Sequence, residues 1–245
     1  MGWTGDPVWL ADVLRAAGLD VIEHEGWRDR GHGDFRDLRG VLCHHTAGGG
    51  KNDWRIVQDG RADLPGPLAQ LVLERDGTFR VIAAGVCWHA GRGSWPGWPT
   101  DNANYHVIGI EAVSRGDGTD WTPAQLDAYK RGCAAILARI GRDAEDCVAH
   151  REYSHEGKID PAGIDMDEFR REVQAFIDGE RAGAAVLLDH RMRDAFVDGV
   201  TERAALDGVE APVVPGAADA HTVTPGVLTV DAARLAAGEH ALLLE

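Results

Sequence analysis

The segment Gly40-Val41-Leu42-Cys43-His44-His45-Thr46-Ala47 passes abruptly from apolar to polar residues. Its first half predicts a compact strand over residues 40–44, which runs into two histidines and a glycine-rich loop. A polar pair at the mouth of an apolar strand is a common position for a functional site in sheet proteins. Taken alone, the pair is more simply interpreted as two satisfied surface histidines.

Further helices and strands are predicted on both sides of this strand. Arg75-Asp76-Gly77 is a hairpin signal between two apolar runs. Thr122-Pro123-Ala124-Gln125 is a capping box that opens an amphipathic helix ended by Gly141. The remaining elements expected are strands over 68–73, 79–83, 107–113 and 147–149, and helices that begin at Asp6-Pro7, near Trp54 and at Asp165, the last closed by Gly179. Strands interleaved with helices, with one hairpin, predict an α/β fold in which a mixed central β-sheet is flanked by helices.

The composition changes near residue 180. All eight tryptophans lie at or before Trp121, whereas residues 181–245 contain no Trp, no Tyr and one Phe. We therefore expect an N-terminal helical lead-in over 1–23, a main domain over 24–179 and a small C-terminal module over 180–245. The sequence leaves the fold and role of this module open.

The charge balance excludes several classes of protein. The chain has 25 Lys and Arg against 40 Asp and Glu, a net charge of −15, which argues against nucleic-acid binding and against electrostatic docking on membranes. No apolar run approaches the length of a membrane span, so we expect no membrane insertion. The first residues lack the features of a signal peptide, so synthesis in a host cytoplasm without export by a signal peptide is expected.

A second polar segment runs from His150 through Lys158 to Asp160-Pro161. Two imidazoles and one carboxylate, with a fourth position open to water, form a standard catalytic zinc set. Lys158 and Asp160 are two residues apart, so in an extended segment their side chains would project to the same face. A charged loop that is merely solvated is the alternative interpretation.

Four motifs in register resemble one known family. They are Val41 to Ala47, Trp88-His89-Ala90-Gly91, Ile108-Gly109-Ile110-Glu111 and His150 to Pro161. Together they resemble the zinc-dependent N-acetylmuramoyl-L-alanine amidases of type 2, which are related to the peptidoglycan-recognition proteins. The resemblance covers roughly residues 24–178, and the opening helix with the Gly26-to-Gly33 stretch is most similar to endolysins of actinobacterial phages.

The resemblance implies a role for each matching residue. The zinc ligands of the family fall on His44, His150 and Asp160, and Zn²⁺ is the only cofactor implied. The catalytic glutamate falls on Glu111 and the catalytic lysine on Lys158. His45 follows a ligand and is not implied to be one. Some members carry a Tyr before the hairpin, where this chain has Pro67-Leu68-Ala69-Gln70, so the glutamate-assisted variant fits this sequence and the tyrosine-assisted variant does not.

Other residues near the motifs have two interpretations each. Thr46, His89 and Trp95 are candidates for the substrate groove, although a structural role explains His89 equally well and core packing explains Trp95 equally well. His106 and His155 match no ligand position, so we interpret both as bystanders. The sequence Lys51-Asn52-Asp53-Trp54 is most simply a solvated helix with one apolar anchor.

The resemblance implies a peptidoglycan hydrolase in which zinc-activated water cleaves the amide bond between N-acetylmuramic acid and L-alanine. A phage endolysin that acts on the cell wall after release is the expected setting, with peptidoglycan as the partner. The alternatives are a non-catalytic peptidoglycan-binding module of the same fold and a host amidase for wall recycling. The C-terminal module is expected either to bind the wall or to pack on the catalytic domain, and the oligomeric state stays open.

Overall fold

A computed structural model of the protein describes residues 5–188, 203–206, 209–214, 227–228 and 242–244. The chain divides into two compact units, Met1–Arg181 and Ala182–Glu245. Within the described residues, every helix is too short or too polar to cross a lipid bilayer.

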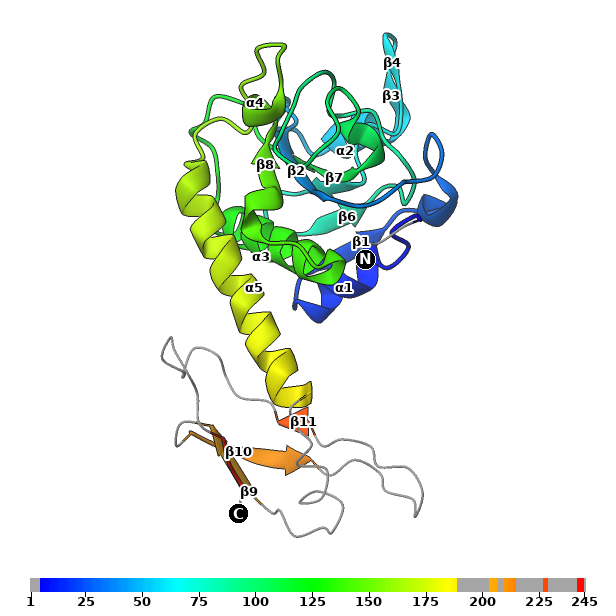
Figure 1. Cartoon of the computed structure of the whole chain (residues 1–245). Helices are drawn as coiled ribbons and strands as arrows, with labels where there is room; N and C mark the ends of the chain where they lie inside the picture. Colours follow the sequence, from blue (N-terminus) through cyan, green and yellow to red (C-terminus); the bar gives the residue numbers. More distant parts are fainter. Residues whose placement is uncertain (1–4, 189–202, 207–208, 215–226, 229–241, 245) are drawn as a thin grey trace. The chain divides into compact units, whose positions relative to one another are not determined.

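The first unit is built on a six-stranded sheet in the order β1-β6-β5-β7-β2-β8 (Figure 1). Neighbouring strands are parallel except β5 and β6, which form the antiparallel hairpin predicted around Arg75-Asp76-Gly77. The mixed sheet flanked by helices is thus confirmed. The strands are β1 (Val21–Glu23), β2 (Gly40–His45), β5 (Leu71–Leu73), β6 (Phe79–Val81), β7 (Val107–Ala112) and β8 (Cys147–Ala149).

Five helices and a small hairpin complete this unit. The helices are α1 (Leu10–Ala16), α2 (Asp53–Asp59), α3 (Pro123–Ile140), α4 (His150–Tyr153) and α5 (Met166–Leu188), and the hairpin joins β3 (Gly60–Arg61) to β4 (Leu64–Pro65). Short 3₁₀ turns lie at 27–29, 103–105 and 144–146.

Helix α3 begins and ends as its sequence predicts, and it supports the end of β2. The hydroxyl of Thr122 accepts the N–H of Gln125 at 3.0 Å, and Gly141 ends the helix in a left-handed conformation with φ of 70°. On the buried face of α3, the Tyr129 hydroxyl lies 3.1 Å from the carbonyl oxygen of His44 and 3.2 Å from that of Ile110. This contact fixes the backbone of β2 where its polar residues begin.

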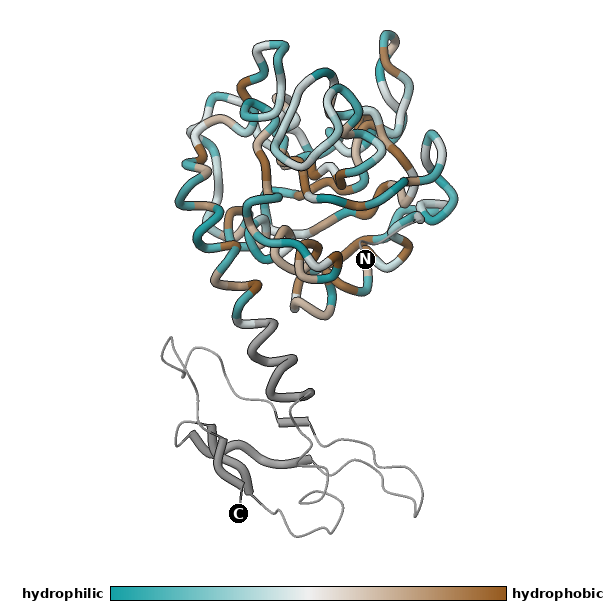
Figure 2. The backbone as a smooth tube through the Cα atoms, in the orientation of Figure 1, coloured by the Kyte–Doolittle hydropathy of each residue, from teal (hydrophilic) through white to brown (hydrophobic). Residues whose placement is uncertain are grey.

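Strand β2 is buried along its whole length. Val41 and Cys43 belong to the apolar cluster that includes α3, whereas Leu42 belongs to a separate cluster with Ala90 and Trp98. Side chains alternate between the two faces of a strand, so His44 lies on the face opposite Cys43. Figure 2 shows the strands of this sheet as the most hydrophobic part of the unit.

The N-terminal segment differs from expectation in two ways. Asp6 does not cap a helix, because α1 begins at Leu10 without a side-chain cap and the Asp6 carboxylate instead accepts the N–H of Phe35 at 3.0 Å. Leu10 and Leu14 are fully buried in the same cluster as α3, and β1 extends the sheet. Residues 5–23 therefore contribute a helix, and a strand that the sequence did not predict, to the core of the first unit.

Helix α5 does not end at Gly179 as expected but continues to Leu188. Gly179 meets no atom that would obstruct a side chain and does not adopt a left-handed conformation, so it lies within the helix as a tolerated interior glycine. The second unit, described by itself, contains an antiparallel sheet in the order β11-β10-β9-β12. Its strands are β9 (Arg203–Leu206), β10 (Val209–Val214), β11 (Val227–Leu228) and β12 (Leu242–Leu244).

Candidate metal centre and active site

Three potential metal ligands converge at one edge of the sheet. His44 lies near the end of β2, His150 follows β8 directly, and Asp160 lies in the loop before α5. Because β2 and β8 are parallel neighbours, their carboxyl ends meet at the same edge. Nδ1 of His44 lies 3.1 Å from Nδ1 of His150 and 2.9 Å from Oδ2 of Asp160, and the last two atoms are 3.0 Å apart.

The opposite ring nitrogens of the two histidines are held by further contacts. Nε2 of His150 lies 3.0 Å from the carbonyl oxygen of Ala90, which only accepts, so this nitrogen donates a proton to it. Nε2 of His44 lies 3.1 Å from Nδ1 of His89. Contacts of this kind fix the orientation and tautomer of metal-binding histidines.

The charge states of Asp160 and His44 suit a cation. Burial acts to raise the pKa of Asp160, but the hydrogen bonds with His150 and His44 outweigh it and hold the pKa far below its usual range. Burial lowers the pKa of His44. Neutral imidazoles and an ionised carboxylate are the forms that bind metals, and two nitrogens with one oxygen form a donor set that fits zinc.

Glu111 lies on the next strand, directly opposite His44 in the pairing of β2 with β7. Its Oε2 atom is buried and has no hydrogen-bond partner. Burial, and then the nearby charge of Asp160, raise the pKa of Glu111 to about 8, although Lys158 acts against the shift. A carboxyl group that titrates near neutral pH is suited to take up and return a proton.

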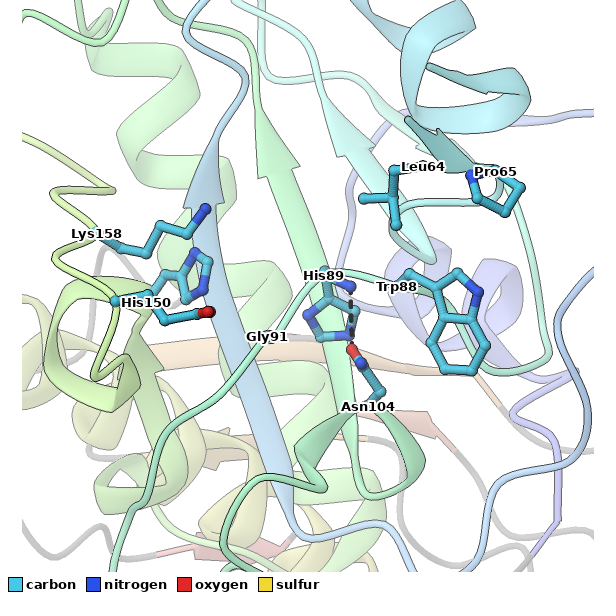
Figure 3. Close-up of a pocket in the computed structure, with 9 residues that line it drawn as sticks. Leu64, Pro65, Trp88, His89, Gly91, Asn104, His150 and Lys158 are labelled. Atoms are coloured by element: carbon cyan, nitrogen blue, oxygen red, sulfur yellow. Dashed lines mark hydrogen bonds between the residues drawn. The ribbon is translucent and has the colours of Figure 1, made fainter. Parts of the chain in front are cut away.

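A pocket of about 400 Å³ opens beside these groups (Figure 3). It is lined by His89, His150 and Lys158 together with Trp88, Asn104 and strand β4 (Leu64–Pro65). Lys158 is exposed, and Figure 3 shows its side chain extending beside His150. The Asn104 side-chain oxygen accepts the backbone N–H groups of His89 and Ala90 at 3.0 and 2.9 Å. Asn104, which the sequence did not single out, therefore fixes the loop that carries His89.

The side chain of Thr46 forms a hydrogen bond within the loop that follows β2. Its hydroxyl donates to Oδ2 of Asp53 at 2.5 Å, and Oδ1 of Asp53 accepts the N–H of Gly50 at 3.2 Å. Asp53 is 8% exposed, which differs from the solvated helix start expected for it. The pair closes the glycine-rich loop after β2, and no spacing signal in the sequence indicates this contact.

The structure places the other candidate residues outside the donor cluster. Trp95 does not line the pocket described above; its indole N–H donates to the carbonyl of Glu145 at 3.2 Å and its ring packs beside an apolar cluster. His45 accepts the N–H of Ala162 at 3.1 Å. His106 contacts Asp37 at 2.7 Å, and His155 is exposed beside Ser94.

The site is suited to metal-assisted hydrolysis. Two imidazoles and a carboxylate lie at one edge of the sheet, and a carboxyl group of raised pKa and a pocket lie beside them. Residues 34–163 match the N-acetylmuramoyl-L-alanine amidase family. The chain belongs to this family.

Several solved structures are similar to this chain. AmpD shares 20% identity over 63% of this chain and 93% of its own, with a TM-score of 0.47. AmiD from E. coli, solved with the substrate anhydro-N-acetylmuramic acid-L-Ala-D-gamma-Glu-L-Lys, shares 21% identity over 62% of this chain and 65% of its own, with a TM-score of 0.45. The endolysin LysCS from Clostridium intestinale shares 17% over 63% of this chain and 95% of its own, with a TM-score of 0.43. Comparison with curated proteins gives no significant match.

Proposed function

We propose that the protein is a zinc-dependent peptidoglycan hydrolase that cleaves the amide bond between N-acetylmuramic acid and L-alanine. The observation that carries the proposal is the convergence of the three donor atoms of His44, His150 and Asp160 within 3.1 Å of one another. Membership of the amidase family supports the choice of substrate bond.

His44, His150 and Asp160 would hold the zinc ion. When bound, zinc supplies a Lewis acid that polarises the amide carbonyl and lowers the pKa of water. Glu111 lies opposite His44 on β7, and it accepts a proton from the attacking water and delivers it to the departing amine of L-alanine. The proton goes to the nitrogen because an amine leaves far more readily than an amide anion.

Lys158 contributes positive charge at the mouth of the pocket. Its ammonium group lies beside His150 (Figure 3), where it stabilises the negative charge that develops on the carbonyl oxygen of the substrate. His89 positions His44 through the 3.1 Å contact between their rings. The pocket lined by Trp88, Leu64 and Pro65 would receive the peptide or the sugar beside the scissile bond.

Catalysis is favoured over the alternative of a non-catalytic binding module. A binding module has no use for a buried carboxyl oxygen without a partner, as in Glu111, because leaving such an atom unsatisfied costs about 1–3 kcal/mol. A binding module likewise has no use for three titratable groups, those of His44, His150 and Asp160, gathered at one buried point. Both features serve a reaction.

The setting that we propose is a phage endolysin, made in the host cytoplasm and acting on the cell wall after release, with the C-terminal unit as a wall-binding module. The resemblance of the opening helix and of the Gly26-to-Gly33 stretch to phage endolysins supports this setting over a host enzyme for wall recycling.

Metal removal tests the proposed chemistry on a small substrate. The protein is treated with a chelator, dialysed and assayed on an N-acetylmuramoyl-L-alanyl peptide before and after zinc is restored, with products separated by mass spectrometry. We expect release of free N-acetylmuramic acid and of a peptide with a new L-alanine amine only in the zinc-restored sample. Full cleavage in the chelated sample would contradict zinc dependence.

A further inference from the structure

Three cysteine thiols meet on the face of β2 opposite the catalytic site. Cys43 comes from β2, Cys133 from α3 and Cys147 from β8. Sγ of Cys43 lies 3.8 Å from that of Cys133 and 3.7 Å from that of Cys147, and all three sulfur atoms lie within 4.8 Å of one another. All three residues are buried.

The two separations from Cys43 match those of sulfur atoms that share one metal ion. Zinc–sulfur bonds of about 2.3 Å place two ligand sulfurs about 3.8 Å apart at a tetrahedral angle and about 4.0 Å apart at a trigonal angle. A disulfide needs about 2.05 Å and a suitable pair of backbone positions. In the pairing of β2 with β8, Cys147 lies opposite Val41 and Cys43 lies opposite Ala149, so the two cysteines are not direct cross-strand partners.

We propose that Cys43, Cys133 and Cys147 form a second metal site that binds one soft d¹⁰ cation through three thiolates. Soft sulfur ligands select cations such as Cu⁺, Zn²⁺ and Cd²⁺, whereas the nitrogen and oxygen donors of the catalytic site are harder. Each thiol that binds the ion releases its proton to solvent. Among the residues that the structure describes, the potential metal ligands at this point are these three cysteines. A site with three ligands suits an ion that accepts three-coordination.

An ion bound at this position would stabilise the fold. β2 leads directly into His44 and β8 into His150, and α3 packs against both strands through the same apolar cluster. An ion held by one residue from each element would tie the three together. Binding to the folded state alone raises the melting temperature, by an amount that grows with the logarithm of the ion concentration divided by Kd.

Cadmium is the probe for the experiment, because its bonds to thiolates give an ultraviolet charge-transfer absorption that imidazole and carboxylate ligands do not give. The full-length, reduced and zinc-loaded protein is titrated with Cd²⁺, and absorption and melting temperature are recorded. Cys133→Ala removes one ligand. Cys87→Ala is the matched control, because Cys87 is also buried but its thiol lies at the carbonyl of Gly85, 3.5 Å away, outside the cluster.

We expect one equivalent of thiolate-bound Cd²⁺ and a higher melting temperature in the wild type and in Cys87→Ala, and neither effect in Cys133→Ala. Absence of the thiolate absorption in the folded wild type would overturn the proposal. So would an absorption that persists in Cys133→Ala or disappears in Cys87→Ala. If Cys133→Ala fails to fold, Cys147→Ala replaces it, and the ¹¹³Cd resonance of the wild type still separates sulfur from nitrogen and oxygen ligands.

Discussion

The imidazole ring of His89 lies so close to Gly109 in β7 that a Cβ atom at position 109 would stand 2.8 Å from the ring. Nδ1 of the same ring lies 3.1 Å from Nε2 of His44. Gly109 therefore leaves the space in which His89 supports His44, the proposed zinc ligand, and this explains a glycine within the apolar part of β7.

Gly109→Ala should displace the ring of His89 and disturb its contact with His44. We expect zinc affinity to fall by about 10- to 100-fold, as for other residues that orient metal ligands, and the free energy of unfolding to fall by about 1–3 kcal/mol through overpacking. Competition with a chelator and urea denaturation measure the two effects. Gly179→Ala is the control, because nothing lies within 4 Å of its added Cβ; unchanged zinc affinity in Gly109→Ala would contradict the role of His89.

Removal of a ligand should remove the metal. His150→Ala should purify without zinc, and Asp160→Ala should hold it weakly, because two remaining donors are too few to retain the ion. Elemental analysis of the purified proteins measures zinc per chain. His155→Ala, which changes an exposed histidine outside the cluster, should keep one zinc per chain, and a full zinc complement in both ligand variants would rule out the assignment.

Glu111→Gln and Lys158→Ala should separate binding of zinc from chemistry. Both proteins should fold and retain zinc, while kcat falls by about 10²–10⁴ for loss of the proton carrier and by about 10²–10³ for loss of the charge at the carbonyl oxygen. Steady-state cleavage of an N-acetylmuramoyl-L-alanyl peptide measures the loss. Lys51→Ala removes an exposed lysine on another loop and should leave kcat unchanged. Activity near that of the wild type in Glu111→Gln would exclude Glu111 as the proton carrier.

The raised pKa of Glu111 predicts how pH affects the metal-free protein. Folding raises this pKa from 4.5 to about 8, so between these values the folded state binds more protons than the unfolded state and stability falls as pH rises. Relative to Glu111→Gln, the wild type should lose on the order of a few kcal/mol between pH 5 and pH 8. Chemical denaturation of both metal-free proteins across this range measures the difference, and a constant difference would show that Glu111 titrates normally.

A shortened chain tests the role assigned to the C-terminal unit. Because α5 continues to Leu188, truncation after Leu188 leaves the helix whole, whereas truncation after Gly179 would cut it. A wall-binding module predicts that the shortened enzyme cleaves soluble muropeptides normally but sediments poorly with sacculi. Loss of cleavage of both substrates together, with a lower melting temperature, would instead indicate a packing extension.

The helices and strands that hold the site were predictable, because hydrophobic patterning and helix capping within a few residues determine them. The apolar run before His44 forms β2, and the capping box at Thr122 opens α3. His44 lies near the end of β2 and His150 lies directly after β8, and the parallel pairing of these strands brings the two residues together. The sequence did not determine this pairing, because it did not determine the order of the strands. The raised pKa of Glu111 required the structure, because it depends on burial and on the distance to Asp160.

Contacts between distant loops were beyond sequence reasoning. Asp53 was expected in solvent, yet it closes the loop of Thr46, and Asn104 gave no signal of its contact with the loop of His89. Trp95 had two interpretations that sequence could not separate, since only tertiary packing decides which loop borders the pocket. Gly179 is a good helix end locally, but a single glycine costs only about 1 kcal/mol inside a helix.

Product chemistry on whole peptidoglycan tests the central claim most directly. Purified sacculi are digested with the zinc-loaded protein, and mass spectrometry and end-group analysis record which bond is cut. We predict peptides that begin with a free L-alanine amine, glycan strands that keep intact muramic acid, and no new reducing ends, with no products from Glu111→Gln. New reducing sugar ends, or peptides cut within the stem while the muramoyl–alanine bond stays intact, would contradict the account.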